Sequence, residues 1–211
     1  MYRHFIWDWN GTLLNDAWLC VDIINSMLEE RGIERVTAER YAQIFGFPLK
    51  EYCRKLGFNL ERESYEELSD RFMEIYEQRR LECRLQDGAR ELLSEVREKE
   101  IEQSLLSAYK QDTLRELVDF FRLGEYFQAV VGVDNHYGNG KIERGRQRIA
   151  EMEHSGEEIL LIGDTLHDLE VAEAMGVDCA LVPSGHQHID RLREGGGRVV
   201  ESLSEVCGWV E

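Results

Sequence analysis

An acidic residue stands two positions before an Asn-Gly-Thr turn near the start of the chain, in the stretch 8–13 (Asp-Trp-Asn-Gly-Thr-Leu). The stretch ends an apolar run, and this pattern predicts a strand that leads into a tight turn. Because open α/β sheets bind ligands at the carboxyl ends of their strands, the carboxylate of Asp8 is predicted to face a ligand. Asn10 occupies the place where a second acid would be expected. Asn-Gly is also a common turn dipeptide, so this motif alone leaves a structural role open.

Further polar residues fall at or near the ends of later apolar runs. Ser107 ends the run 104–107, Lys141 follows a glycine-rich turn, and Asp164 and Asp168 follow the run 159–162. In a doubly wound sheet, groups at the carboxyl ends of several strands converge on one crevice. We therefore expect these side chains to gather around Asp8. Each of them alone also has an ordinary explanation, as a buried hydroxyl, a solvated loop charge or a helix cap.

Alternating strands and helices must position these residues. Short continuous apolar runs predict the strands of a mostly parallel sheet that is buried on both faces. They lie at 4–9, 101–108, 129–134, 158–163, 177–183 and 198–200. Helical patterns between them predict helices at 87–97 and 112–121, with Asp87 and Asp112 as N-caps. A further helix is predicted at 166–175, ending at Gly176. We expect Trp7 and Trp9 to pack in the core or to form walls of the site rather than to have a chemical role.

One segment, from Asp16 to about Glu82, shows no convincing strand. Apolar residues recur there at helical spacing, and Ser64 with Glu67 forms a capping-box pattern at the start of one helix. The segment follows the turn after Asp8, so it is predicted to cover that site, exclude water and select the substrate. We therefore predict a core domain of residues 1–14 and 83–211 and a helical cap of residues 15–82.

The composition restricts the possible partners. The 211 residues include 42 acidic and 25 basic side chains, for a net charge of −17. This charge disfavours nucleic acid and anionic membranes as partners. No apolar run approaches the ~18 residues of a membrane span, and the first residues do not resemble a secretion signal. The five scattered cysteines lack a Cys-x-x-Cys pair, which favours reduced thiols in a cytoplasmic protein. The oligomeric state is left open.

Taken together, these residues resemble the motifs of the haloacid dehalogenase superfamily, most closely its phosphatase branch with a helical cap after the first motif. The stretch 8–13 resembles the first motif, Ser107 the second, Lys141 the third, and Asp164 with Asp168 the fourth. The region between Ser107 and Lys141 is similar to phosphoglycolate-phosphatase-like members. The resemblance implies an α/β fold: a Rossmann-like three-layer α/β/α sandwich with a mostly parallel sheet and an inserted helical cap subdomain.

The resemblance also implies a reaction, the Mg²⁺-dependent hydrolysis of a small phosphorylated metabolite. Asp8 would attack the phosphoryl group and form an aspartyl-phosphate, which splits one difficult displacement into two easier ones. Mg²⁺ would be bound by Asp8, Asp164 and the main-chain carbonyl of Asn10, with Asp168 supporting the metal shell. Lys141 would neutralise charge between the nucleophile and the phosphate.

Other residues would hold the substrate. The resemblance assigns phosphoryl contacts to Ser107, to Thr12 and to the amide of Gly11. Lys50 lies in a stretch of the predicted cap that is similar to a specificity loop, and it is a candidate substrate contact. His186 and His188 form a loop pair without a matched third ligand, and we expect them to serve loop structure rather than metal binding.

Asn10 departs from the family pattern, which usually has an aspartate that protonates the leaving oxygen and later deprotonates the attacking water. An amide can do neither, and positioned acid–base catalysis typically contributes about 10² to 10⁴ in rate. One hypothesis is a phosphatase that is weak on alkyl esters and better on aryl or acyl phosphates. The alternative is a catalytically impaired relative that binds a phosphorylated ligand or a protein partner. His167 and His136 are candidates for a replacement acid.

Overall fold

A single parallel sheet forms the centre of the protein. The computed structural model describes residues 1–134 and 140–209. Within this part of the chain the sheet has six strands in the order β5-β4-β1-β6-β7-β8. Their bounds are β1 His4–Trp7, β4 Glu102–Lys110, β5 Ala129–Val133, β6 Ile159–Gly163, β7 Asp178–Leu181 and β8 Arg198–Val199. Each predicted strand is therefore present, with its ends moved by one or a few residues.

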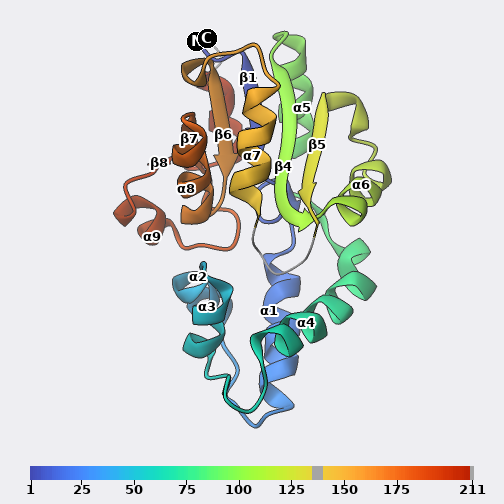
Figure 1. Cartoon of the computed structure of the whole chain (residues 1–211), viewed down its shortest axis with the longest axis vertical. Coiled ribbons are helices and arrows are strands. Elements are labelled where there is room, and N and C mark those ends of the chain that lie inside the picture. The colour runs from blue at the N-terminus through green and yellow to red at the C-terminus, as the bar shows by residue number, and fades with distance from the viewer. Residues whose placement is uncertain (135–139, 210–211) are drawn as a thin grey trace.

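Helices cover both faces of this sheet (Figure 1). On one face, α5 (Ala89–Glu98), α6 (Gln111–Phe120) and the 3₁₀ helix η4 (Leu203–Trp209) share an apolar core with Trp7 and Trp9, both fully buried. On the other face, α7 (Lys141–Ala150) and α8 (Leu166–Met175) pack on a second cluster around Ile6 and Leu161. Burial on both faces explains the continuous apolar runs of the strands. The predicted Rossmann-like three-layer α/β/α sandwich is thus confirmed.

Between β1 and α5 the described residues form four α-helices, α1 (Ala17–Glu29), α2 (Ala38–Ile44), α3 (Leu49–Leu56) and α4 (Tyr65–Arg79). They lie beyond the carboxyl edge of the sheet (Figure 1). The capping box of Ser64 and Glu67 is present at the start of α4. A short antiparallel pair, β2 (Leu14–Asn15) and β3 (Arg84–Leu85), joins the two ends of this α1–α4 segment. Because the chain leaves and returns through paired strands, the segment is anchored close to the end of β1.

Two predicted N-caps are wrong. Helix α5 begins after Gly88, whose φ of +77° suits glycine, so Asp87 lies before the cap. Strand β4 runs on to Lys110 and α6 begins at the next residue, which places Asp112 inside the first turn. The predicted end of α8 is correct, because Gly176 caps that helix with a φ of +71°. Among the described helices, none has the length and apolar character needed to cross a membrane.

Candidate active site

A buried ion-pair cluster forms at the carboxyl edge of the sheet. Asp8 follows β1, Lys141 opens α7 after Gly140, and Asp168 lies in the first turn of α8. The Lys141 Nζ lies 2.5 Å from Asp8 Oδ1 and 2.5 Å from Asp168 Oδ1. Burial alone would lower the pKa of Lys141, but the charges of Asp168 and Asp8 outweigh it and raise that pKa. Lys141 is therefore a fixed positive charge between two carboxylates.

A third carboxylate, that of Asp164, completes the cluster at the end of β6. Asp8, Asp164 and Asp168 each bring one carboxylate oxygen within 4.8 Å of the others. Burial together with repulsion from Asp8 and Asp168 raises the pKa of Asp164, and burial raises the pKa of Asp8 to about 6 despite Lys141. Burial also opposes ionisation of Asp168, but Lys141 outweighs it and lowers that pKa.

This cluster fits a hard divalent cation. Its donors are carboxylate oxygens, the ligand type that Mg²⁺ prefers, and they crowd together more negative charge than Lys141 neutralises. A cation would relieve the repulsion that raises the pKa of Asp164. The predicted metal ligands Asp8, Asp164 and Asp168 are thus brought together.

The turn after Asp8 depends on a glycine at position 11. Gly11 has a φ of +78°, and a Cβ there would lie 2.2 Å from Asp164 Oδ2. Its amide donates to Leu14 O and to Asp16 Oδ1, both at 2.9 Å, so in this geometry it is not free for the predicted phosphoryl contact. Thr12 is fully buried, and its hydroxyl donates to Asp8 Oδ2 at 3.2 Å. Thr12 therefore orients the Asp8 carboxylate and does not line the pocket.

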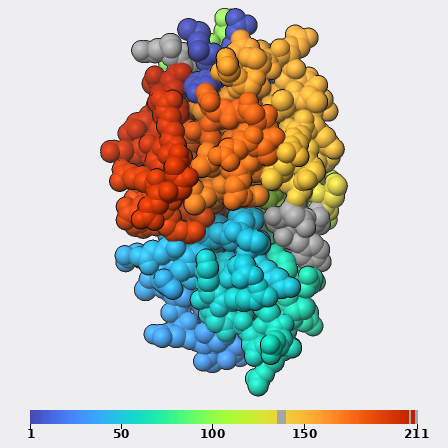
Figure 2. Space-filling view, turned by 60° about the vertical axis from the view of Figure 1, so that its left-hand side comes forward, coloured from blue at the N-terminus to red at the C-terminus, as the bar shows by residue number. Residues whose placement is uncertain are grey.

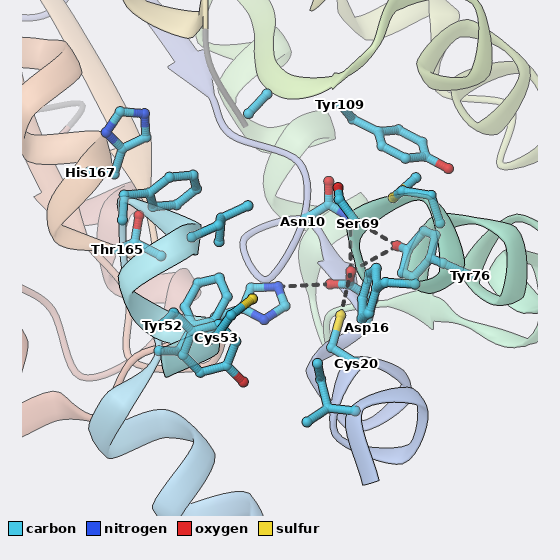
Figure 3. A pocket seen from close by; sticks show the side chains of 18 of the residues that line it. Asn10, Asp16, Cys20, Tyr52, Cys53, Ser69, Tyr76, Tyr109, Thr165 and His167 are labelled. Atoms are coloured by element: carbon cyan, nitrogen blue, oxygen red, sulfur yellow. Dashed lines mark hydrogen bonds and ion pairs between the residues drawn. The ribbon is translucent and has the colours of Figure 1, made fainter. Parts of the chain in front are cut away.

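The side chain of Asn10 is held by a network that the sequence did not reveal. Its Nδ2 donates to Asp16 Oδ2 at 2.8 Å and to the Tyr76 hydroxyl at 2.9 Å. The Tyr76 hydroxyl donates to the same Asp16 oxygen at 2.8 Å (Figure 3). In the sequence, Asp16 marks only the start of the strand-free segment, and no role is assigned to Tyr76. Only the fold brings them together, since they lie 60 residues apart.

His186 completes this network from the loop after β7. Its Nε2 lies 3.3 Å from Asp16 Oδ1, and its Nδ1 lies 2.8 Å from the Tyr41 hydroxyl. Burial opposes the charge of each partner, but their mutual attraction raises the pKa of His186 to about 9 and lowers that of Asp16. His186 therefore connects the loop after β7 to Asp16 by an ion pair and to Tyr41 by a hydrogen bond. His188 is structural, because its ring accepts the amide of Asp190 at the start of α9 (Ile189–Glu194).

A pocket of about 210 Å³ lies between the sheet edge and the α1–α4 segment. Figure 2 shows that segment packed directly against the core. Asp8, Asn10, Ser107 and Lys141 line the pocket, and so do Asp164 and Asp168. The Ser107 Oγ accepts the amide of Tyr109 at 3.1 Å, which leaves its hydroxyl hydrogen available to donate.

Two other candidates have different positions. Lys50, on α3, lines a separate surface hollow with Arg54, so this geometry does not bring it to the carboxylates. His167 lines the pocket, where its ring stacks on Phe47 at 4.3 Å between centroids and its Nδ1 lies 3.1 Å from Glu170. His136 lies outside the described residues.

Comparison with known proteins identifies the family. The model of the haloacid dehalogenase-like hydrolases matches residues 5–182, and the chain belongs to this family. Among curated proteins it is similar to the tyrosine-protein kinase PtkA of Mycobacterium tuberculosis, with 25% identity over 95% of this chain and 69% of that protein. It is also similar to phosphoglycolate phosphatase 1 of Pseudomonas aeruginosa, with 24% identity over 88% of this chain and 71% of that protein. The crystal structure of a predicted phosphatase from Clostridium acetobutylicum shares the fold, with a TM-score of 0.83, 20% identity and coverage of 100% and 98% of the two chains.

Proposed function

We propose that this protein is a Mg²⁺-dependent phosphatase that hydrolyses a small phosphorylated metabolite through an aspartyl-phosphate on Asp8. The observation that carries this proposal is the joint position of Asp8, Lys141, Asp164 and Asp168 on one wall of a pocket. The similarity to a phosphoglycolate phosphatase supports the same class of reaction.

The proposed reaction has two steps. An Asp8 carboxylate oxygen forms a bond to phosphorus while the bond from phosphorus to the leaving oxygen breaks, and that oxygen keeps the electron pair. Water then attacks the phosphorus, the bond from phosphorus to Asp8 breaks with its electron pair returning to the carboxylate, and inorganic phosphate leaves with the oxygen and both protons of the water. Lys141 holds the Asp8 carboxylate in place and offsets negative charge, and the Ser107 hydroxyl donates to a phosphoryl oxygen. Mg²⁺, held by Asp8, Asp164 and the Asn10 carbonyl with support from Asp168, would neutralise charge between nucleophile and phosphoryl group.

The Asn10 amide restricts the leaving group in this proposal. Its Nδ2 donates hydrogen bonds to Asp16 and to the Tyr76 hydroxyl, which hold the amide in one orientation. An amide is not an acid at neutral pH, so this side chain cannot transfer a proton to the leaving oxygen. Leaving groups that depart as stable anions, such as phenolates and carboxylates, need no such proton. We therefore propose a preference for aryl and acyl phosphates over alkyl phosphates.

The proposal includes the organisation of the chain. Residues 1–14 and 83–211 would form the catalytic core and residues 15–82 a helical cap. The β2–β3 pair supports this division, because it lies where the chain leaves the core and where it returns. The described cysteines Cys20, Cys53, Cys83 and Cys179 are free, which supports a reducing, cytoplasmic setting.

A second candidate function is that of a binding protein with little turnover. Asn10 favours it, because loss of the proton donor would spare the phosphate-binding groups. In that case the pocket would hold a phosphorylated ligand or part of a protein partner without releasing phosphate.

Steady-state rates on phenyl phosphate and on an alkyl phosphate, each with Mg²⁺ and with a chelator, test the proposal. We expect Mg²⁺-dependent turnover with phenyl phosphate favoured by roughly 10² or more. Equal rates on both esters would overturn the leaving-group argument, and absence of turnover on both would favour the binding function. As a readout independent of activity, Mg²⁺ should raise the melting temperature of the wild type but not that of Asp164→Asn.

A further inference from the structure

The wall of the pocket opposite the carboxylates is aromatic. Phe45 lies between Tyr41, stacked at 5.2 Å between ring centroids, and Tyr52, edge-on at 5.2 Å. Phe72 stacks on Tyr76 at 5.9 Å. These rings come from α2, α3 and α4 and the loop between α2 and α3, and all of them line the pocket. Packed rings of this kind give a rigid surface that suits another flat ring.

This wall offers no free positive charge. Every cationic or potentially cationic side chain in the described lining already faces an acid: Lys141 faces Asp8 and Asp168, His186 faces Asp16, and His167 faces Glu170. The described lining contains no arginine and no lysine besides Lys141. A carboxylate or second phosphate on the substrate would be buried there without an opposite charge beside it, and burying an uncompensated charge is costly.

The volume fits one ring. The phosphoryl group must lie against Asp8 and Lys141, which leaves the rest of the 210 Å³ for the leaving group. A cavity of about 150 Å³ is enough for benzene. A single aromatic ring with small uncharged substituents therefore fits beside the phosphoryl group.

The aromatic wall and Asn10 favour the same type of substrate for two different reasons. The wall favours an uncharged ring, and the amide of Asn10 favours a leaving group that departs without a proton. From this agreement we infer that the substrate is a monoaryl phosphate whose ring carries no carboxylate or second phosphate. The inference rests on the proposed phosphatase function and adds its substrate class, which differs from a small ester that carries a carboxylate beside the phosphate, such as 2-phosphoglycolate.

Two matched pairs of substrates test the inference on the full-length chain with Mg²⁺. The first pair is 4-methylphenyl phosphate and 4-carboxyphenyl phosphate, and the second is benzyl phosphate and 2-phosphoglycolate. Within each pair the leaving groups are of one type, so the effect of Asn10 largely cancels. We expect kcat/KM to favour the uncharged member of each pair by at least roughly tenfold. Equal or better rates on the carboxylates would overturn the inference.

A binding measurement separates this inference from the proposed function. Titration calorimetry with Mg²⁺ present compares phenylphosphonate with phosphonoacetate, neither of which can be hydrolysed at an ester bond. If no ester is turned over, the phosphatase proposal fails, and tighter binding of phenylphosphonate by at least roughly tenfold still supports the aromatic pocket. Equal binding, or tighter binding of phosphonoacetate, would overturn the inference whatever the turnover.

A charge introduced into the wall provides a sharper test. Phe72→Arg places a cation in the pocket and should shift the ratio of kcat/KM within the first pair towards the carboxylate by at least roughly tenfold. The matched control is Phe120→Arg on α6, where the native ring is 53% exposed and lies outside the pocket lining, and it should leave the ratio unchanged. Circular dichroism checks that both variants are folded. A folded Phe72→Arg variant with the wild-type ratio would contradict the role of this wall, and the wild-type binding comparison decides the inference if Phe72→Arg does not fold.

Discussion

Strand β1 carries a cluster of titratable side chains at each end. Both clusters bring three potential metal-binding groups together: Asp8, Asp164 and Asp168 at the carboxyl end, and His4, Glu102 and His154 at the amino end. The two clusters are alike in size, and each combines a residue in or directly after β1 with residues of neighbouring elements. They differ in how their charges are balanced.

At the amino end the groups satisfy one another. Glu102 lies 3.2 Å from His4 Nδ1 and 2.8 Å from His154 Nε2, and His4 Nε2 lies 2.9 Å from Ser104 Oγ. Burial lowers the pKa of His4 to about 4, and hydrogen bonding from His154 lowers that of Glu102 to about 2. This cluster needs no cation and serves to join strands.

At the carboxyl end like charges remain crowded. Asp8 and Asp168 share Lys141, while burial and repulsion raise the pKa of Asp164. Natural proteins tolerate such unfavourable electrostatics mainly where function requires them. The contrast shows that short distances alone do not distinguish the two clusters, whereas unbalanced charge that faces a pocket does.

The largest effect that we expect comes from Asp8→Asn. The amide has no anionic oxygen to attack phosphorus, so kcat on an aryl phosphate should fall by at least about 10⁴. Stopped assays of phenol release measure it. Glu102→Gln, the matched carboxylate-to-amide change at the other end of β1, should keep kcat within about twofold. Similar losses in both variants would remove the functional distinction between the two ends.

Removal of the shared cation should cost stability at the carboxyl end. Lys141→Met leaves Asp8 and Asp168 as buried carboxylates without a counterion, which should lower the free energy of unfolding by about 3 to 5 kcal/mol. Urea denaturation without Mg²⁺ measures this change. Glu102→Gln at the amino end should cost no more than about 1 kcal/mol, because that side chain is 42% exposed. A Lys141→Met variant as stable as wild type would mean that Lys141 does not hold this cluster together.

Restoring an acid at position 10 should raise turnover selectively. Asn10→Asp places a carboxyl group next to Asp16, where two like charges favour retention of one proton that can pass to a leaving oxygen. We expect kcat/KM, which reports the step that expels the leaving group, to rise about 10²-fold on an alkyl phosphate, with a much smaller gain on an aryl phosphate. Steady-state assays on both esters check the ratio. An equal gain on both esters, or none, would contradict the account of Asn10.

The smallest effect concerns pH at the amino end. Burial lowers the pKa of His4 from 6.5 to about 4, so its contribution to stability is present above pH 6.5 and is lost as the pH falls towards 4. The destabilisation caused by His4→Gln should therefore shrink by about 2 kcal/mol between about pH 7 and pH 4.5. Urea denaturation of both proteins at both pH values measures this difference. A constant difference would show that folding does not lower the pKa of His4.

Much of this arrangement could be predicted from the sequence. The apolar runs indicated each strand of the sheet, and the residue types at their ends indicated Asp8, Ser107, Lys141, Asp164 and Asp168 as a group. The sequence pattern did not predict the features that depend on contacts between distant segments. The short helices α2 and α3 lack a long apolar stripe, and the partners of Asn10 come from segments up to 66 residues away.

The most direct test of the central claim is a rapid-quench experiment with wild-type protein, Mg²⁺ and an aryl phosphate. Because Asn10 cannot activate water, we expect hydrolysis of the aspartyl-phosphate to be slower than its formation. The account predicts a burst of phenol equal to the amount of enzyme, together with one phosphoryl group on Asp8 in the mass spectrum of the quenched protein. Steady phenol release from the first turnover, with no phosphoryl group on Asp8, would contradict it.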